Sequence, residues 1–213
     1  PDTFFTHTGL SLADGATYYS HIRGLDGASQ PIDTASSDGV TIDLTAPIMD
    51  AIYEGDLSED MDLQQSTESL TLAWSGSDDA SGIDYYEYAW GTTAGAADIV
   101  AWSATNEQSA ETTGLSLQDG SMYYGSVRGT DIVGNQSATL TGDGLTIDAS
   151  PPMGGVVIDG DSIDIDFTSS TTTLTASWSG FTDAGSGIGE YKYAIGTAPG
   201  SVQNVYWLSV GMD

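Results

Sequence analysis

One internal repeat limits what this chain can fold into more than any other feature of its sequence. Residues 9–26 read GLSLADGATYYSHIRGLD, and residues 114–131, which begin 105 positions later, read GLSLQDGSMYYGSVRGTD. The same offset carries DGVTID at residues 38–43 onto DGLTID at residues 143–148. A repeat of this length has the size of a small domain, so the sequence predicts one folded unit that recurs along the chain.

The phase of the repeat divides the chain into three parts. A second pair of similar segments, at residues 70–92 and 174–197, lies outside the first pair. Residues 1–47 match only the second half of a unit, and residues 151–213 match only the first half. We therefore expect one complete unit at residues 48–150 and two half-units around it.

Three arrangements explain the two half-units. The chain is a window cut from a longer repeat array, or the tail of one chain and the start of the next complete a unit head to tail, or the two ends of one chain close on each other. The third is the least favoured, because the ends would have to meet across a full domain. A half-unit left alone exposes unpaired strand edges and an apolar face.

Apolar side chains alternate with polar or small ones in a period of two, which is typical of strands. Leu70, Leu72 and Trp74 show this alternation, and residues 85–90 and 123–130 continue it. Clusters of Asp, Asn, Ser and Gly separate these stretches, and no segment carries a convincing helical stripe. The sequence predicts an all-β fold of tandem antiparallel β-sandwich repeats of about 105 residues, with about seven strands each.

The order of several aromatic residues resembles the fibronectin type III domain, an immunoglobulin-like β-sandwich. Trp74, followed by Ile83 and Tyr86, is similar to that family's early-strand Trp and the Tyr after it. Leu117 and Tyr123 resemble the Leu and Tyr of a turn in which the family spaces them six residues apart. The resemblance implies a tyrosine corner, in which the Tyr hydroxyl bonds back to the backbone of the turn.

Two further segments refine this resemblance. Leu12 and Tyr18 repeat the spacing of the Tyr turn in the first copy. The family places a β-branched apolar residue where this chain has Gly125, or Ser20 in the first copy, so the core must differ there. Residues 41–47, TIDLTAP, resemble the ends of repeats in very large bacterial surface adhesins. That likeness implies an extracellular or cell-surface setting.

The charge balance excludes two classes of partner. Three Lys or Arg residues stand against 31 Asp or Glu residues, so the formal net charge is −28. Such a chain has no basic patch for nucleic acid or for an anionic membrane surface, and no apolar run is long enough for membrane insertion. Hydrophobic residues still make up 39% of the chain, so we expect a folded protein with an acidic surface.

The sequence contains little material for catalysis. Cysteine is absent, and the two histidines, His7 and His21, align with Thr112 and Ser126 in the next copy. No nucleophile elbow, phosphate loop or zinc-binding helix motif is present. We therefore expect no catalytic residues, no organic cofactor and no enzymatic activity.

Recurring acidic residues instead make calcium the expected cofactor, since this ion takes six to eight oxygen ligands. The candidate ligands are the loop acids Asp78, Asp79 and Asp183, the alternating acids Asp60, Asp62, Asp164 and Asp166, and the acids Asp43 and Asp148 near the joints between units. Alternating acids would share one face if they lay in a strand. The competing interpretation is that all of these are solvated surface acids.

Together these features favour a structural role. We expect a repeat of an extracellular fibre or surface adhesin that forms a semi-rigid linear shaft, because Pro47 and Pro151–Pro152 restrict the joints. The expected partners are copies of the chain, head to tail, and glycans or other cell-surface ligands. The alternative is an accessory spacer or carbohydrate-binding module of a secreted polysaccharide-active enzyme, which would need Trp90, Trp102 or Trp207 exposed in a row.

Overall fold

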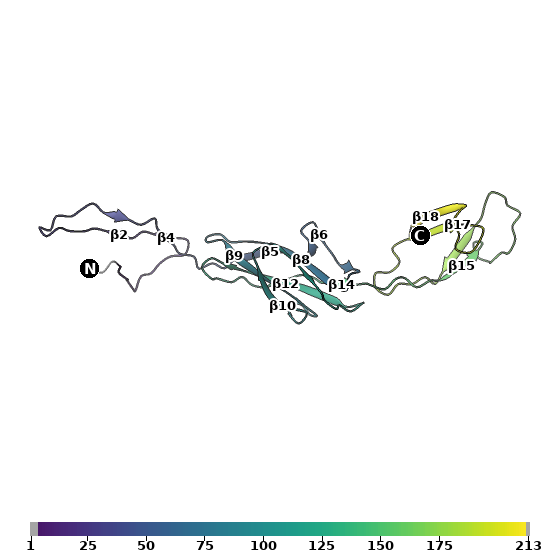
Figure 1. Cartoon of the computed structure of the whole chain (residues 1–213), viewed down its shortest axis with the longest axis horizontal. Helices are drawn as coiled ribbons and strands as arrows, with labels where there is room; N and C mark the ends of the chain where they lie inside the picture. The colour runs from purple at the N-terminus through teal and green to yellow at the C-terminus, as the bar shows by residue number, and fades with distance from the viewer. Residues whose placement is uncertain (1–3, 212–213) are drawn as a thin grey trace. The chain divides into compact units, whose positions relative to one another are not determined.

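The computed structural model describes residues 4–211, which form strands, turns and loops but no helix (Figure 1). The predicted all-β fold is therefore confirmed. The strands are β1 (Thr17–Tyr18), β2 (His21–Ile22), β3 (Ala35–Ser36), β4 (Val40–Thr41), β5 (Ile48–Asp56), β6 (Glu59–Asp60), β7 (Leu63–Gln64), β8 (Ser69–Ser77), β9 (Ile83–Gly91), β10 (Val100–Thr105), β11 (Ser109–Thr113), β12 (Met122–Asp131), β13 (Leu140–Thr141), β14 (Leu145–Ile147), β15 (Val156–Asp159), β16 (Ala176–Ser179), β17 (Tyr191–Ile195) and β18 (Val205–Gly211).

Contacts divide the chain into two compact units. The first unit combines Pro1–Glu59, Thr71–Ala110 and Tyr124–Asp143, and the second combines Asp60–Leu70, Glu111–Tyr123 and Gly144–Asp213. The domain boundaries expected from the repeat, after residues 47 and 150, remain predictions.

Two antiparallel sheets organise the first unit. Strand β9 pairs with β10 along one edge and with β12 along the other, and Arg128 lies opposite Glu87. These two side chains form an ion pair at 2.8 Å. Strand β5 pairs with β8 in the other sheet, with Ile52 opposite Trp74.

The sheets of the first unit pack on each other around Trp74. Its fully buried ring lies 5.8 Å from the rings of Tyr86 and Tyr88, measured between centroids. An aromatic side chain of this kind buries roughly 150–250 Å², which contributes about 4–6 kcal/mol as an upper bound. Trp74 and Tyr86 thus lie in the core, on strands that the alternation predicts.

The close approach of Leu72 explains the unexpected Gly125. A Cβ atom built on Gly125 would lie 2.2 Å from Cδ1 of Leu72, which is too near for any side chain to remain without a shift. Leu72 is fully buried and fills the space that a β-branched residue would otherwise occupy. The local departure from the fibronectin pattern is therefore an exchange of volume: a small residue in one sheet, Gly125, makes room for a large residue in the other, Leu72.

In the second unit, Tyr123 fastens the turn that precedes β12. Its side chain is 3% exposed, and its hydroxyl oxygen accepts a hydrogen bond of 3.0 Å from the backbone N–H of Gln118. Tyr18 does the same in the first unit, with the backbone N–H of Ala13 at 2.9 Å. The hydrogen bond implied by the resemblance is present, while membership of the family remains a prediction.

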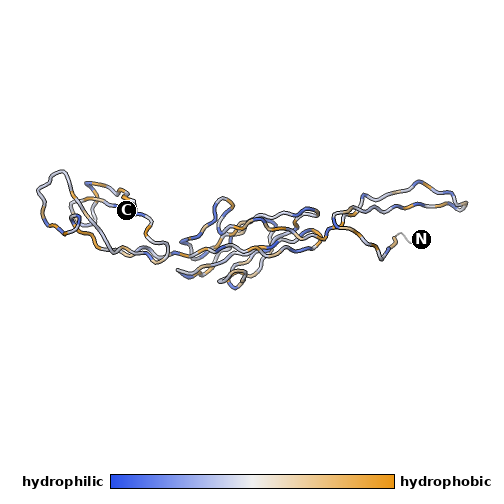
Figure 2. The backbone as a smooth tube through the Cα atoms, turned by 180° about the vertical axis from the view of Figure 1, so that it is seen from behind, coloured by the Kyte–Doolittle hydropathy of each residue, from blue (hydrophilic) through white to orange (hydrophobic). Residues whose placement is uncertain are grey.

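The segments at either end repeat the strand pairing found within residues 48–150. Strands β1 and β4 pair Thr17 with Thr41, and the corresponding strands β12 and β14 pair Met122 with Thr146. Each residue of the second pair lies 105 positions after its counterpart in the first. Strands β2 and β3 match β12 and β13 in the same way, and β15 with β16 matches β5 with β8. The sequence repeat is thus also a repeat of strand register, and hydrophobic residues recur along the backbone of both end segments (Figure 2).

Candidate metal centre

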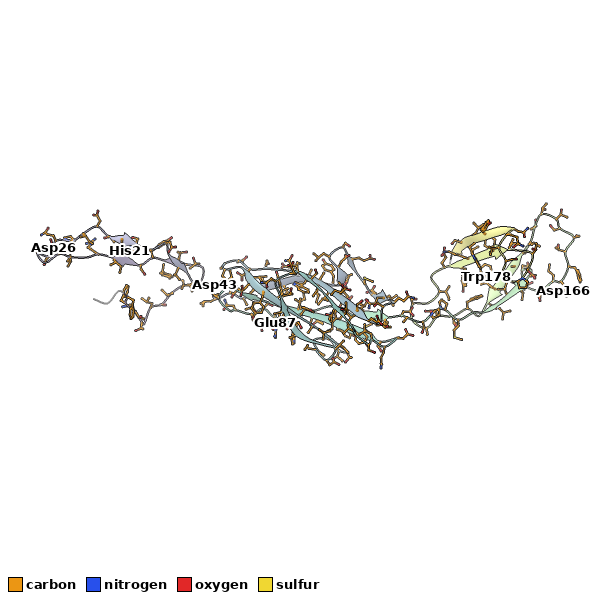
Figure 3. All side chains as sticks on the ribbon, in the orientation of Figure 1. His21, Asp26, Asp43, Glu87, Asp166 and Trp178 are labelled. Carbon is orange, nitrogen blue, oxygen red and sulfur yellow. The ribbon has the colours of Figure 1, made fainter. Side chains whose placement is uncertain are left out.

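Three carboxylates converge in the first unit. Asp43 follows β4, Asp78 follows β8 and Asp131 ends β12, and each offers an oxygen atom within 4.8 Å of the others. Asp43, labelled in Figure 3, lies where the N-terminal ribbon leads into β5. The three acids are separated widely in sequence, so the fold alone brings them together.

Asp131 is the most deeply buried member of this Asp43–Asp78–Asp131 cluster, with 1% of its surface exposed. Its Oδ1 accepts hydrogen bonds from the backbone N–H groups of Val133, Gly134 and Asn135, and its Oδ2 accepts one from the side-chain amide of Asn135. Burial raises the pKa of Asp131, but these hydrogen bonds lower it more, so the net pKa lies below its usual value. The carboxylate is therefore charged at neutral pH.

Asp78 supplies an oxygen atom that has no protein partner. Its Oδ1 accepts hydrogen bonds from the backbone N–H groups of Ala80 (3.1 Å) and Gly82 (2.7 Å). Its Oδ2 is buried without a hydrogen-bond partner, and so is the hydroxyl oxygen of Ser81. A buried carboxylate oxygen without a partner, beside two further carboxylates, is costly unless a cation compensates it. Calcium, a hard cation that binds such oxygens at about 2.3–2.6 Å, fits this donor set.

Asp43 connects the N-terminal segment to the complete repeat. Its Oδ2 accepts a hydrogen bond of 3.0 Å from the backbone N–H of Ser81, and its Oδ1 accepts one of 3.1 Å from Thr45. The side-chain amide of Asn135 also donates to the carbonyl oxygens of Asp43 (3.4 Å) and Thr45 (3.3 Å). These hydrogen bonds therefore hold the joint in addition to Pro47.

The same arrangement recurs in the second unit. The backbone N–H of Ser186 donates to Oδ2 of Asp148 at 2.8 Å, as Ser81 does to Asp43. Asp183 accepts hydrogen bonds from the backbone N–H groups of residues 185–187 through its Oδ1, which is the role of Asp78 in the first unit. Asp43 and Asp78 are thus brought together, as are Asp148 and Asp183, although the sequence placed them in separate groups of candidate ligands.

The other predicted ligands lie elsewhere. Asp79 is exposed beside the cluster. Asp60 ends β6, whereas Asp62 lies in the bend after it, so the two do not share a strand face. Asp164 and Asp166 are exposed and lie outside any strand, and Oδ1 of Asp164 accepts a hydrogen bond from the backbone N–H of Asp159. Of these four acids only Asp60 lies in a strand, so neither pair shares a strand face.

Sequence reasoning missed two buried acids. Asp131 is not among the predicted ligands, although the recurrence of Arg-Gly-x-Asp at the end of both copies of the segment is a signal that could have found it. Glu54 is fully buried in β5, and its Oε1 accepts a hydrogen bond of 3.2 Å from the backbone N–H of Gly125. Nothing in the local pattern around Glu54 distinguishes it from a surface acid, because its burial depends on the facing sheet.

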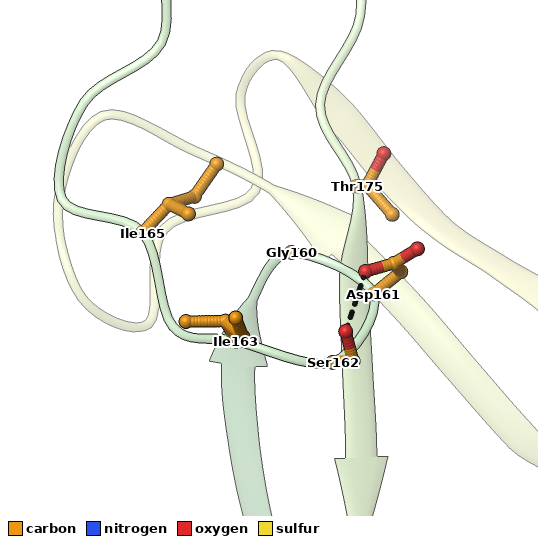
Figure 4. Close-up of a pocket in the computed structure, with 6 residues that line it drawn as sticks. All are labelled: Gly160, Asp161, Ser162, Ile163, Ile165 and Thr175. Carbon is orange, nitrogen blue, oxygen red and sulfur yellow. Dashed lines mark hydrogen bonds between the residues drawn. The ribbon is translucent and has the colours of Figure 1, made fainter.

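One pocket of about 400 Å³ lies in the second unit (Figure 4). It is lined by Gly160, Asp161, Ser162, Ile163, Ile165 and Thr175. Ile163 is 73% exposed, and Asp161 accepts a hydrogen bond of 3.0 Å from the hydroxyl of Ser162. Asp161 is the one acid among these lining residues, and a single solvent-facing carboxylate does not make the paired arrangement of a hydrolase.

Comparison with protein families and with curated proteins gives no relative. No protein-family model matches the chain, and no curated protein sequence matches it either. The part of the chain that the structure describes contains no helix able to cross a membrane.

Proposed function

We propose that this chain is a structural segment of an extracellular fibre or surface adhesin, in which β-sandwich repeats of the fibronectin type III kind form a semi-rigid shaft. The observation that carries the proposal is the recurrence of one joint. Asp43 and Ser81 form it in the first unit, and Asp148 and Ser186 form it in the second. A chain that repeats both its strand register and its joint is built for regular extension along one direction.

Calcium is the cofactor we propose for the joint. The cluster of Asp43, Asp78 and Asp131 contains a buried oxygen that lacks a protein partner, and the three acids come from both sides of the joint. An ion shared between them would oppose bending, because bending would separate its ligands. This role suits an acidic protein in a calcium-containing extracellular medium.

The stiffness of the joint can be measured with spin labels. The chain has no cysteine, so Ala28→Cys and Glu107→Cys, both at exposed positions, place one label in the N-terminal ribbon and one in the complete repeat. Pulsed electron resonance at low protein concentration should give a narrow distance distribution in calcium and a broader one in EDTA. A distribution that is equally broad in both would contradict a semi-rigid shaft.

The alternative function, a carbohydrate-binding accessory module, has one observation in its favour. Tyr206 and Trp207 are 74% and 63% exposed. Trp90, however, is fully buried, and Trp102 lies beneath the guanidinium of Arg128 at 4.3 Å. The row of exposed aromatics that sugar stacking needs is therefore not formed by these three Trp residues. Binding of the chain to a polysaccharide array, abolished by Trp207→Ala, would favour this alternative.

A further inference from the structure

We propose that residues 4–47 of one copy dock on residues 151–211 of a second copy and complete a β-sandwich like the one at residues 48–150. This inference rests on the proposed function, because docking of one copy on the next would extend a shaft of repeats. The complete repeat provides the template, since its two halves show how the equivalent end segments would fit.

The apolar face of the N-terminal segment is uncovered. Tyr18 is 39% exposed and Ile22 is 55% exposed, whereas the equivalent Tyr123 and Val127 are 3% and 0% exposed. The backbone of the segment is already in place, because β1 pairs with β4 and β2 with β3 in the register of the complete repeat. In the complete repeat the equivalent side chains are covered by the other half of the core.

The C-terminal segment carries the complementary face. Leu174 is 65% exposed, whereas the equivalent Leu70 is fully buried. Trp207 is also exposed, and its equivalent Trp102 is covered by Arg128. Arg23 holds the place of Arg128 in the N-terminal segment, so docking would lay its guanidinium over Trp207.

Within the described part of the chain, each end segment also has a strand edge without a partner, and the equivalent strands of the complete repeat pair with each other. In the complete repeat β12 pairs with β9, which places Val127 opposite Tyr88. Among residues 4–211 the equivalent strand β17 pairs with β18 alone, and β2 pairs with β3 alone. The template therefore predicts an antiparallel ladder between copies that places Ile22 opposite Tyr193.

A pair of compensating differences in side-chain size supports the fit most directly. In the complete repeat Leu72 fills the space left by Gly125. Strand register makes Ala176 the equivalent of Leu72, because Asp159 lies opposite Ala176 as Glu54 lies opposite Leu72. Ser20 is the equivalent of Gly125. A smaller residue in one end segment thus accompanies a larger one in the other, as expected if the two pack together.

One position of the interface is matched poorly. Glu87 lies opposite Arg128 in the complete repeat, but its equivalent in the C-terminal segment is Lys192, which would face Arg23. Lys192 has Glu190 as its own partner at 2.9 Å, which moderates the repulsion. This mismatch allows a test in which a substitution should strengthen assembly.

Two blocking variants test the proposal through mixing. Ile22→Asp should disable the N-terminal face, and Leu174→Asp should disable the C-terminal face; both side chains are exposed in a single copy, so neither change should unfold it. Sedimentation velocity should show wild-type mass rising with concentration and each variant remaining monomeric. An equal mixture should form a dimer and stop there, because each variant keeps one working face. Leu57→Asp, at a position 54% exposed in the turn after β5, is the matched control and should assemble like wild type.

A third variant tests the register. Lys192→Glu should give Arg23 a partner like the one that Glu87 gives Arg128, and should lower the dissociation constant of assembly about threefold or more. Lys192→Met should give a dissociation constant between those of Lys192→Glu and the wild type.

The proposal would be overturned if the wild-type chain stays monomeric at all concentrations, if either blocking variant assembles alone, or if their mixture stays monomeric. Those results would leave an unrelated partner or a further stretch of the same polymer as the occupant. A narrow spin-label distribution without assembly would reject only this inference, and assembly with a broad distribution would reject only the semi-rigid shaft.

Discussion

The carboxylate of Asp43 accepts a hydrogen bond from the backbone N–H of Ser81 at 3.0 Å, across a sequence separation of 38 residues. Asp148 and Ser186 form the same bond at 2.8 Å across the same separation. Each bond links the residues before a joint to a loop of the repeat that follows it. Two equivalent bonds at two joints make this contact a regular feature of the chain.

Asp78→Asn should abolish the stabilisation by calcium. If the ion binds only the folded protein, calcium at about 100 times its dissociation constant adds about 2.7 kcal/mol, which raises the melting temperature by several degrees. Asn can still accept the hydrogen bonds of Ala80 and Gly82 but carries no charge. Asp79→Asn is the matched control, because Asp79 is the exposed neighbour outside the cluster. Scanning calorimetry with and without calcium measures this change in melting temperature. An equal rise in both variants would argue against this site.

Gly125→Ser should destabilise the complete repeat, because the added atoms meet Leu72. We expect a loss of about 1–3 kcal/mol in the free energy of unfolding, measured with urea. Adding Leu72→Ala creates the Ser and Ala combination of the end segments and should relieve part of the overlap. The double variant should therefore lose less free energy than the sum of the single changes, and strict additivity would count against the contact.

Tyr123→Phe should cost about 1 kcal/mol of unfolding free energy, because it removes the hydroxyl that accepts from the backbone N–H of Gln118. The ring itself, 3% exposed, should remain packed. Tyr206→Phe, at a position 74% exposed, should change the unfolding free energy by a few tenths of a kcal/mol at most. A similar loss in both variants would show that the hydroxyl bond is not the cause.

Acid should destabilise the fold through carboxylates whose pKa values are lowered on folding. The hydroxyl of Ser150 and the backbone N–H of Ala149 lower the pKa of Asp119, and the hydrogen bonds described above lower that of Asp131. Such groups contribute stability above their unfolded pKa of about 3.9, and this contribution is lost as the pH falls through the folded values. Unfolding free energy should therefore fall below about pH 4, and Asp119→Asn should flatten that slope relative to wild type. An unchanged slope would contradict the assignment.

Local patterns were sufficient for the strands and for part of the core. Alternation of apolar residues predicted strands through Trp74, Tyr86 and Tyr123, because a strand turns successive side chains to opposite faces. The repeat also aligned Asp78 with Asp183 and Asp43 with Asp148, since equivalent residues need only be compared along the chain. The same alignment located the tyrosine turn in both copies.

Tertiary structure decided which acids meet and which side chains are covered. Asp131 joins Asp43 and Asp78 only because the register of β12 against β9 carries the end of β12 to the loop after β8, and no local pattern specifies such a register. Glu54 and Gly125 depend likewise on the sheet that faces them. The sequence by itself determined the strands, the repeat and the excess of acidic charge, because these follow from residue order and composition. The metal cluster, the exchange of volume at Leu72 and the uncovered faces of the end segments depended on packing between distant strands.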